Sequence, residues 1–429
     1  MKIKIKHMDY EKVMALPRPE HRSPLYPSRL LRAAIRVLAM WEMFRTKFTY
    51  TTERMEEVGD EPCLILMNHS SFLDLKIASR IFFPKPYCIV CTTDGFVGKS
   101  WLMRWLGCIP TLKFVSDLQL IRDMQYALKK KRANVLMFPE AGYTFDGCAL
   151  PLPQRMSVLV KKLDVPIVTV ITHGSFAYDP LYNCLQKRRV KANAEVKCIL
   201  TREEIRTLPA EEIDRRIKAE FTFDNFKWQH DNKIEITESF RADGLERILY
   251  KCAACGAEGG MKGSGTTLTC SRCGKTYTMD VLGRLQAHDG VTEYPHIPDW
   301  YNWQRSCVRR ELEAGEYALD TDVDIGLLVD HKALYMVGEG HLTHDANGFV
   351  LTGCGGKLHY EQSPLAAYSL NSDYFWYEIG DVICIGNKDC LYYCFPRTEG
   401  VVTKTRFAAE ELYKMNKTEK RRRMRAVTE

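Results

Sequence analysis

The apolar positions in the first half of the chain gather into short runs, each of which ends in a polar or glycine-containing turn. Residues 63–67, 135–138 and 165–170 are such runs. A short apolar run bounded by turn residues is typical of a buried strand, and the amphipathic stretches between the runs predict helices, notably over residues 117–132. Strands that alternate with helices indicate an α/β sheet with flanking helices, in which ligand sites lie at the carboxyl ends of the strands.

The second half of the chain has a different pattern. Aromatic positions around Trp300 predict a connecting helix, and turns such as Asn347-Gly348 separate short strand-like segments after it. The predicted strands cover residues 325–329, 333–337, 374–379, 382–385 and 391–395. A helix is expected from about residue 407. Many strands followed by one helix resemble a pleckstrin-homology-like barrel, so a small β-rich domain is expected here.

Residues 28–45 carry an amphipathic pattern. Arg29, Arg32 and Arg36 recur on one stripe, and the remaining positions are largely apolar and include a tryptophan. A basic stripe beside a wide apolar face is typical of a helix that lies in the head-group plane of an anionic membrane. The alternative is a helix whose apolar side packs on the next domain. We expect residues 1–50 to form a membrane-associating helical region.

Composition narrows the setting of the protein. The chain has 429 residues, 45% of them hydrophobic, and a net charge of +7, which is too mild to indicate a partner. It begins without the apolar core of a signal peptide, and we find no run of about 20 apolar residues. Its 16 cysteines fit a reducing compartment. We therefore expect a cytoplasmic protein, peripheral to the cytoplasmic face of the membrane. A basic run from Lys417 to Arg425 could add attraction to an anionic surface or could be a solvated tail.

The turn after residues 63–67 carries the strongest candidate for catalysis. It reads Asn68-His69-Ser70-Ser71-Phe72-Leu73-Asp74. A neutral imidazole can take a proton from an alcohol, and a nearby carboxylate can hold the ring in one tautomer. The alternative is structural: Ser71 would cap the following helix, with Asp74 as the acid of a capping box.

Further motifs follow in order along the chain. They are Gly107-Cys108-Ile109-Pro110-Thr111-Leu112-Lys113, Phe138-Pro139-Glu140-Ala141-Gly142 and the apolar block at 165–170. Together with the Asn-His-x4-Asp box, they resemble the glycerolipid acyltransferases, in particular the 1-acylglycerol-3-phosphate acyltransferase family, over roughly residues 60–180.

The resemblance implies roles for particular residues. His69 would be the general base for an acceptor hydroxyl, Asp74 would hold its imidazole, and no catalytic metal is expected. The residues implied in substrate binding are Asn68, Lys113, Glu140 and Gly142. Backbone N–H groups of residues 68–71 are candidate donors to the oxyanion of the tetrahedral intermediate.

The motifs depart from the family pattern where phosphate would be recognised. The family's arginine in the second box is Lys113 here, and its Gly-Thr-Arg-Ser is Ala141-Gly142-Tyr143-Thr144. Both arginines are therefore absent, and only the first is replaced by another cation. The remaining cation is a point charge rather than a bidentate group. The resemblance implies a lysolipid acceptor, with 1-acylglycerol-3-phosphate first and another hydroxylated amphiphile next. The thioester donor would be acyl-CoA or acyl carrier protein.

Four cysteines form two Cys-x-x-Cys-Gly motifs. Cys252 and Cys255 precede Gly256, and Cys270 and Cys273 precede Gly274. Four thiolates at this spacing can bind Zn²⁺ in a tetrahedron, and each glycine permits a left-handed turn. The pattern resembles a zinc ribbon with a structural Zn²⁺. A redox dithiol is the alternative, which two matched pairs disfavour. Nucleic-acid binding is disfavoured too, because few aromatic residues that could stack on bases lie nearby.

These patterns divide the chain into four regions. They are the helical region 1–50, an acyltransferase domain over 51–235, a zinc ribbon over 245–290, and an aromatic linker helix with the β-rich domain over 291–429. The predicted function is acyl transfer from a thioester to a lysolipid hydroxyl in phospholipid biosynthesis. The alternative is a non-catalytic lipid-binding scaffold, whose ribbon and β-rich domain bind a partner.

Overall fold

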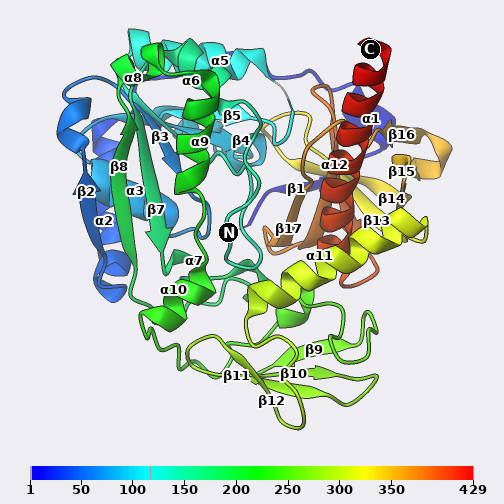
Figure 1. Ribbon diagram of the computed structural model, residues 1–429. Helices are drawn as coiled ribbons and strands as arrows, with labels where there is room; N and C mark the ends of the chain where they lie inside the picture. Colours follow the sequence, from blue (N-terminus) through cyan, green and yellow to red (C-terminus); the bar gives the residue numbers. More distant parts are fainter. Residues whose placement is uncertain (1, 116, 429) are drawn as a thin grey trace.

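The computed structural model describes residues 2–115 and 117–428, and their side chains as far as residue 420. Three parts lie next to one another: a sheet with helices on both sides, a small ribbon of short strands, and a β-rich part crossed by two long helices (Figure 1). The basic run that begins at Lys417 falls largely outside the described side chains.

A seven-stranded sheet forms the first part, in the order β2-β8-β7-β3-β6-β4-β5. Its strands are β2 (Thr49–Glu53), β3 (Leu64–Met67), β4 (Tyr87–Thr92), β5 (Cys108–Thr111), β6 (Asn134–Met137), β7 (Ile167–His173) and β8 (Asn193–Leu200). The five strands from β7 to β5 are parallel, and β8 runs antiparallel to β7. Because parallel strands end at the same edge of a sheet, the turns after β3, β4, β5 and β6 all meet there.

Alternating side chains of the central strands enter two separate cores. Leu64 and Leu66 of β3 pack in one cluster, and Ile65 and Met67 pack in another on the opposite face. All four are fully buried. Burial on both faces explains why the sequence of β3 is a continuous apolar run. The burial of each such side chain stabilises the folded state by about 1.5–3 kcal/mol.

Helices cover both faces of this sheet. They are α2 (Arg29–Arg45), α3 (Asp74–Phe82), α4 (Ser100–Trp105), α5 (Leu118–Gln125), α6 (Met156–Leu163), α7 (Ser175–Tyr178), α8 (Arg202–Thr207), α9 (Ala210–Glu220) and α10 (Asn225–Asp231). Two of them, α7 and α10, lie at the lower end of the sheet in Figure 1. The helix predicted over residues 117–132 is α5, which continues as one π-helical turn, η3 (Tyr126–Lys130). The side chain of Ser28 accepts a hydrogen bond from Leu31 N and so caps α2 at its predicted start.

Helix α2 turns part of its basic stripe toward the protein. The Arg32 guanidinium is buried, donates to the Pro84 carbonyl at 2.6 Å and lies over the ring of Phe83. Arg36 also lies over that ring. The expectation that these arginines face membrane head groups is therefore wrong for Arg32 and Arg36, whereas Arg29 is exposed.

The remaining strands form two antiparallel arrangements. The ribbon contains β9 (Met261–Ser264), β10 (Thr267–Cys270), β11 (Thr276–Met279) and β12 (Leu285–Ala287), in the order β12-β11-β10-β9. The β-rich part contains β13 (Leu319–Leu327), β14 (Leu334–Asp345), β15 (Gly348–Gly353), β16 (Leu358–Gln362), β17 (Asn371–Trp376), β18 (Gly380–Gly386) and β19 (Leu391–Pro396). Helices α11 (Ile297–Ala314) and α12 (Val401–Thr428) pack on each other beside it.

The five strands predicted in this region lie largely within β13, β14, β17, β18 and β19. The turn predicted at Asn347-Gly348 joins β14 to β15. Strands β15 and β16, which follow this turn, were not predicted. An eighth strand, β1 (Ile5–His7), comes from the start of the chain, precedes α1 (Tyr10–Met14), and pairs in parallel with β14. The amino-terminal segment therefore joins the β-rich sheet, and the comparison with a pleckstrin-homology-like barrel stays a prediction.

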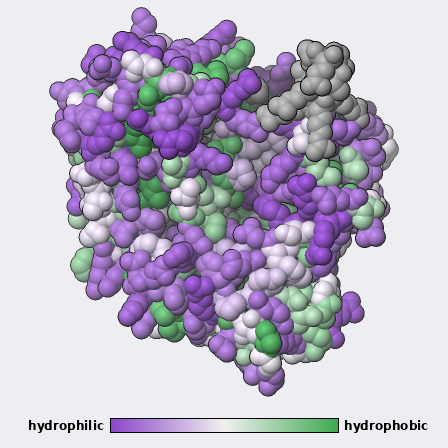
Figure 2. All heavy atoms as spheres, in the orientation of Figure 1, coloured by the Kyte–Doolittle hydropathy of each residue, from purple (hydrophilic) through white to green (hydrophobic). Residues whose placement is uncertain are grey.

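The surface is mostly hydrophilic on the face shown in Figure 2, with small hydrophobic patches. Among the described residues, none of the helices is both long enough and apolar enough to span a membrane.

Candidate active site and metal centre

The imidazole of His69 and the carboxylate of Asp74 meet at the carboxyl end of β3. His69 Nδ1 lies 3.2 Å from Asp74 Oδ2. The same oxygen accepts hydrogen bonds from Ser70 N at 2.8 Å and Ser71 N at 3.0 Å, and the Asp74 side chain is fully buried. The carboxylate lies in the first turn of α3 and also contacts the imidazole. Helix α3 begins at Asp74 itself, with Leu73 as its N-cap and no side-chain cap, so the predicted capping of this helix by Ser71 is wrong. The catalytic interpretation stays a prediction. Because a carboxylate only accepts, the contact requires the proton on Nδ1 and leaves Nε2 as an acceptor.

Two aromatic rings enclose the imidazole. The ring centroids of Phe138 and Tyr143 lie 3.9 and 3.8 Å from that of His69. Burial lowers the pKa of His69, although the bond to Asp74 acts in the opposite direction. A lowered pKa keeps the ring neutral at pH 7, as a general base requires. The sequence contained these rings within its motif but gave no sign that they would stack on the histidine.

The backbone of this turn is fully engaged in internal hydrogen bonds. Asn68 N donates to the Val170 carbonyl, His69 N donates to Glu140 Oε2, and the N–H groups of Ser70 and Ser71 donate to Asp74. The expectation that these four groups bind an oxyanion is therefore wrong for this conformation.

Asn68 and Glu140 hold the turn in place. Asn68 Oδ1 accepts from Thr172 N at 2.8 Å, which fastens the end of β3 to β7. The two oxygens of Glu140 accept from His69 N at 3.0 Å and Leu150 N at 2.5 Å. Burial raises the pKa of Glu140 to about 8, against the effect of these two bonds. Both predicted substrate-binding side chains thus position the backbone around His69.

The third motif contains an exchange of glycine and alanine. Ala141 adopts φ +56°, in the left-handed region that favours glycine, and the family pattern has glycine at this position. Gly142 lies outside that region, and a Cβ placed on it would meet its nearest neighbour, Leu150 Cδ1, at 3.9 Å. The glycine predicted to contact substrate is therefore not required by the local backbone geometry.

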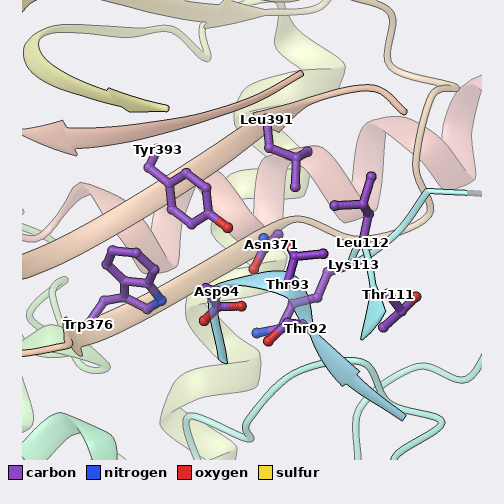
Figure 3. A pocket seen from close by; sticks show the side chains of 10 residues that line it. All are labelled: Thr92, Thr93, Asp94, Thr111, Leu112, Lys113, Asn371, Trp376, Leu391 and Tyr393. Carbon is purple, nitrogen blue, oxygen red and sulfur yellow. The ribbon is translucent and has the colours of Figure 1, made fainter. Parts of the chain in front are cut away.

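Lys113 lies in a polar pocket at the ends of β4 and β5. Thr92, Asp94 and Lys113 line it from the α/β sheet, and Asn371 and Tyr393 line it from the β-rich sheet (Figure 3). The charge of Lys113 acts on His69 and helps to lower its pKa. The structure thus brings the predicted cation to the same edge as the predicted base. The sequence motifs gave no sign that residues of the β-rich sheet would line this pocket.

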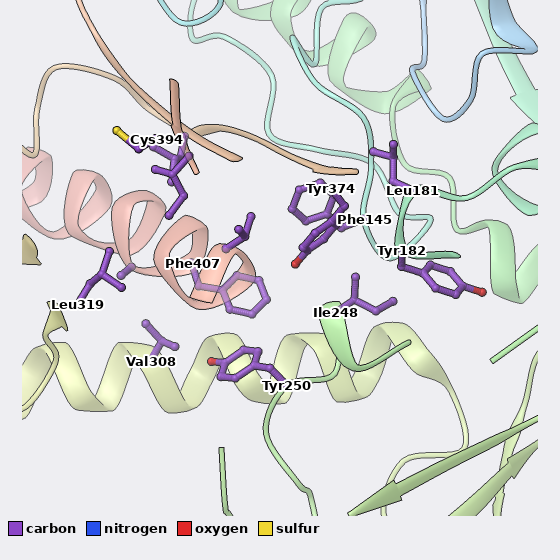
Figure 4. Packing of buried hydrophobic residues seen from close by; sticks show 14 of the residues in the cluster. Phe145, Leu181, Tyr182, Ile248, Tyr250, Val308, Leu319, Tyr374, Cys394 and Phe407 are labelled. Carbon is purple, nitrogen blue, oxygen red and sulfur yellow. The ribbon is translucent and has the colours of Figure 1, made fainter. Parts of the chain in front are cut away.

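The loop after the third motif packs deep in the protein. Phe145 lies 4.5 Å, between ring centroids, from Tyr374 of β17, and Arg406 of α12 lies over the Phe145 ring. Figure 4 shows Phe145 and Tyr374 side by side in one apolar cluster. The same cluster includes Leu268 of the ribbon. The ribbon and the β-rich part therefore share a core with the loop that covers His69.

A third buried acid, after Asp74 and Glu140, lies beside the turn that contains His69. Ser71 Oγ donates to Asp179 Oδ1, and burial raises the pKa of Asp179 to about 7. Asp179 lies just after α7 and belongs to none of the motifs that resemble the family.

The four predicted cysteine ligands converge in the ribbon. Cys252 Sγ lies 3.8 Å from Cys273 Sγ, Cys255 Sγ lies 3.8 Å from Cys270 Sγ, and all four sulfur atoms lie within 4.8 Å of one another. Four sulfur atoms that bind one ion in a tetrahedron, each at ~2.3 Å from it, lie about 3.8 Å from one another. The observed distances between the sulfur atoms therefore fit a metal ion. Gly256 and Gly274 have φ of +75° and +77°, which confirms the predicted left-handed turns.

The comparisons with known proteins agree with the geometry at the sheet edge. Residues 47–173 match the family model described as acyltransferase. This region contains the His69–Asp74 pair and both later motifs, so the likeness to acyltransferases rests on the residues that form the site.

Individual relatives resemble only part of the chain. One is the chloroplastic 1-acyl-sn-glycerol-3-phosphate acyltransferase BAT2 of Brassica napus, at 31% identity over 122 residues, or 27% of this chain. The match spans 34%, about a third, of that relative's length. A solved structure, the 1-acyl-sn-glycerophosphate acyltransferase PlsC of Thermotoga maritima, matches with a TM-score of 0.33 and 16% identity, over 45% of this chain and 81% of that one.

The backbone at Ala141 yields a test of stability. We expect Ala141→Gly to raise the free energy of unfolding by about 0.5–1 kcal/mol, because relief of the left-handed strain exceeds the entropy that glycine adds to the unfolded chain. Urea denaturation measures the change. The matched control, Gly142→Ala, should cost no stability, since its Cβ has room. A loss of stability in Ala141→Gly would contradict this account.

Proposed function

We propose that this protein is an O-acyltransferase that moves a fatty acyl group from a thioester, acyl-CoA or acyl carrier protein, to the hydroxyl of a lysolipid in phospholipid biosynthesis. The contact of His69 Nδ1 with the buried Asp74 carboxylate is the observation that carries this proposal. The family match of residues 47–173 supports it.

The chemistry follows from the orientation of the imidazole. Nε2 takes the proton of the acceptor hydroxyl as its oxygen attacks the thioester carbonyl. The tetrahedral intermediate collapses with loss of the thiolate, which takes the proton from the imidazolium. Asp74 keeps the ring in the required tautomer and stabilises its transient positive charge. The relative named above makes 1-acylglycerol-3-phosphate the reference acceptor.

The exposed face of α2 supports attachment to a bilayer. Trp41 and Phe44 are 67% and 79% exposed, and the exposed side chains Leu30, Leu38 and Met40 lie on the same helix. Helix α2 also packs on the sheet domain through Ala39 and Met43, which are buried, so only part of its apolar side is free for a bilayer. We propose that α2 lies in the interface of the cytoplasmic leaflet and delivers the lysolipid to the sheet edge.

We also propose that the four cysteines bind a structural Zn²⁺. A closed set of four thiolates suits zinc and leaves no coordination position for a substrate. Zinc would stabilise the ribbon and, through the shared core, the adjoining parts.

Substitution of the base tests the reaction. We expect His69→Ala to lower kcat by about 10²–10⁴-fold, because the hydroxyl loses its proton acceptor. Transfer of labelled acyl groups from acyl-CoA to 1-acylglycerol-3-phosphate and other lysolipids measures the effect. In the wild type, kcat/KM should be retained at pH 7 and fall only below about pH 6.5, since burial lowers the pKa of His69 and protonation of Nε2 abolishes the base.

A histidine remote from the site provides the control. His359 is exposed on β16, and His359→Ala should keep wild-type activity. If His69→Ala retained full turnover while folded, the proposed base would be wrong. Lysolipid binding without any turnover in the wild type would favour the scaffold alternative.

Metal analysis tests the ribbon. We expect about one zinc ion per chain by elemental analysis, in line with one four-thiolate site. Cys252→Ser should lose this zinc and lower Tm by about 5 °C or more, because metal binding contributes directly to folding. Cys354→Ser, a substitution of a half-buried cysteine outside the cluster, should retain both. A metal-free wild type with unchanged stability would refute the site.

Vesicle binding tests the orientation of α2. Trp41→Glu combined with Phe44→Glu should weaken co-sedimentation with anionic phospholipid vesicles at least about tenfold, because burial of the apolar face drives binding. Val158→Glu is the matched control, since Val158 is 62% exposed on α6. Equal binding by the double variant and the control would rule out α2 as the attachment site.

A further inference from the structure

The loop after β6 is tied to the backbone of His69 on both sides. His69 N donates to Glu140 Oε2 at 3.0 Å, and Thr144 N donates to the His69 carbonyl at 3.1 Å. Tyr143 lies between these two loop residues in the sequence, and its ring centroid is 3.8 Å from that of His69. The two backbone attachments therefore fix the ring of Tyr143 against the imidazole.

A second aromatic contact adds to this fixed position. The ring of Phe72, which follows the catalytic turn, lies 5.4 Å from that of Tyr143 between centroids. Aromatic contacts of this kind stabilise a ring in one place and leave the polar end of a tyrosine free to bond elsewhere. The hydroxyl of Tyr143 therefore sits on a side chain that is held before any substrate arrives.

The Tyr143 hydroxyl is available to a bound molecule. Among the described residues it makes no hydrogen bond, and it is not one of the polar atoms that are buried without a partner. His69 Nε2 has the same two properties. Because the imidazole is small, a hydroxyl on a ring that packs against it lies only a few ångströms from Nε2. A group that reacts at Nε2 is therefore within reach of this hydroxyl.

The hydroxyl keeps its proton at neutral pH. Burial raises the pKa of Tyr143 well above its usual value, and the charges of Asp373 and Asp74 act in the same direction. A phenol that stays neutral is a hydrogen-bond donor. Tyr143 can therefore donate to an oxygen that gains negative charge.

The catalytic turn itself presents no open donor among its described residues. Its four backbone N–H groups bond within the protein. Asn68 Nδ2 donates to the Thr172 carbonyl at 3.1 Å, and Ser71 Oγ donates to Asp179. Ser70 is 2% exposed. An oxyanion formed next to His69 therefore needs a donor from outside the turn.

We propose that the Tyr143 hydroxyl is this donor and binds the oxyanion of the tetrahedral intermediate. When the acceptor oxygen bonds to the thioester carbon, an electron pair of the carbonyl bond moves to the carbonyl oxygen. Tyr143 stabilises that charge through a hydrogen bond and keeps its proton. The pair returns as the carbon–sulfur bond breaks, and the thiolate leaves with the proton that His69 took from the acceptor.

The inference rests on the proposed acyl transfer and adds a catalytic residue to it. Tyr143 occupies the position of the arginine in the Gly-Thr-Arg-Ser of the glycerolipid acyltransferases that this chain resembles. A neutral donor packed on the base thus stands where the family pattern has a cation.

The substitution Tyr143→Phe removes the hydroxyl and keeps the ring. We expect kcat for transfer from acyl-CoA to 1-acylglycerol-3-phosphate to fall about 10²–10³-fold with KM nearly unchanged, because the hydrogen bond forms only as charge develops. The pH below which kcat/KM falls should stay that of the wild type, since the lost group is uncharged. Tyr50→Phe is the control: Tyr50 is exposed on β2, and its variant should keep wild-type kinetics.

Three results would overturn the inference. One is a folded Tyr143→Phe, checked by thermal unfolding, that keeps the wild-type kcat. Another is a change in KM alone, which would make Tyr143 a binding residue. The third is a shifted pH profile, which would mean that Tyr143 acts through the imidazole of His69.

A binding measurement separates this inference from the proposed function. A long-chain alkyl trifluoromethyl ketone is hydrated in water to a tetrahedral diol, which resembles the intermediate and needs no turnover to bind. We expect the wild type and Tyr50→Phe to bind it about tenfold more tightly than Tyr143→Phe does. If no lysolipid is acylated, acyl transfer is wrong, and this difference in affinity would still support the donor. Equal affinities would overturn it.

Discussion

A buried carboxylate at the first turn of α3 determines the arrangement around the candidate base. Asp74 accepts two backbone hydrogen bonds from the turn and contacts His69 with the same oxygen. The turn would lose its shape if that acceptor were removed, because the N–H groups of Ser70 and Ser71 would be left without partners. Backbone geometry and imidazole orientation therefore depend on one atom, and the parallel sheet brings the remaining groups to it.

The sequence predicted the α/β sheet and the groups of the candidate site well, because both depend on local chemistry. The apolar runs at β3, β6 and β7 are buried on both faces and so have a clear signature. His69 and Asp74 are close in the sequence, and so are the two members of each cysteine pair. The contact of the first pair and the convergence of the cysteines could therefore be predicted from local geometry, that of a helix start and that of metal coordination. The left-handed turns at Gly256 and Gly274 could be predicted because each glycine directly follows a pair of cysteine ligands.

Other features depend on contacts between distant parts of the chain, which periodicity does not report. Asn371 lies about 300 positions after His69 and stood out in no motif, yet it lines the pocket of Lys113 through the sheet-to-sheet packing. The pairing of β1 with β14 joins opposite ends of the chain. The orientation of α2 was misjudged because Arg32 finds a carbonyl and an aromatic ring inside the protein, whereas tryptophan and phenylalanine face outward. The role of Glu140 depends on backbone N–H groups that a residue pattern cannot locate.

The single apolar cluster that includes Phe145, Leu268 and Tyr374 has a consequence for how this chain can have changed during evolution. Appended modules are commonly gained or lost whole when their boundaries fall in exposed linkers. Here the ribbon and the β-rich part complete the same interior as the loop over the histidine, so deletion of either would open that interior to water. We expect descendants of this protein to keep all three parts or none, and to vary instead around the polar pocket between the two sheets.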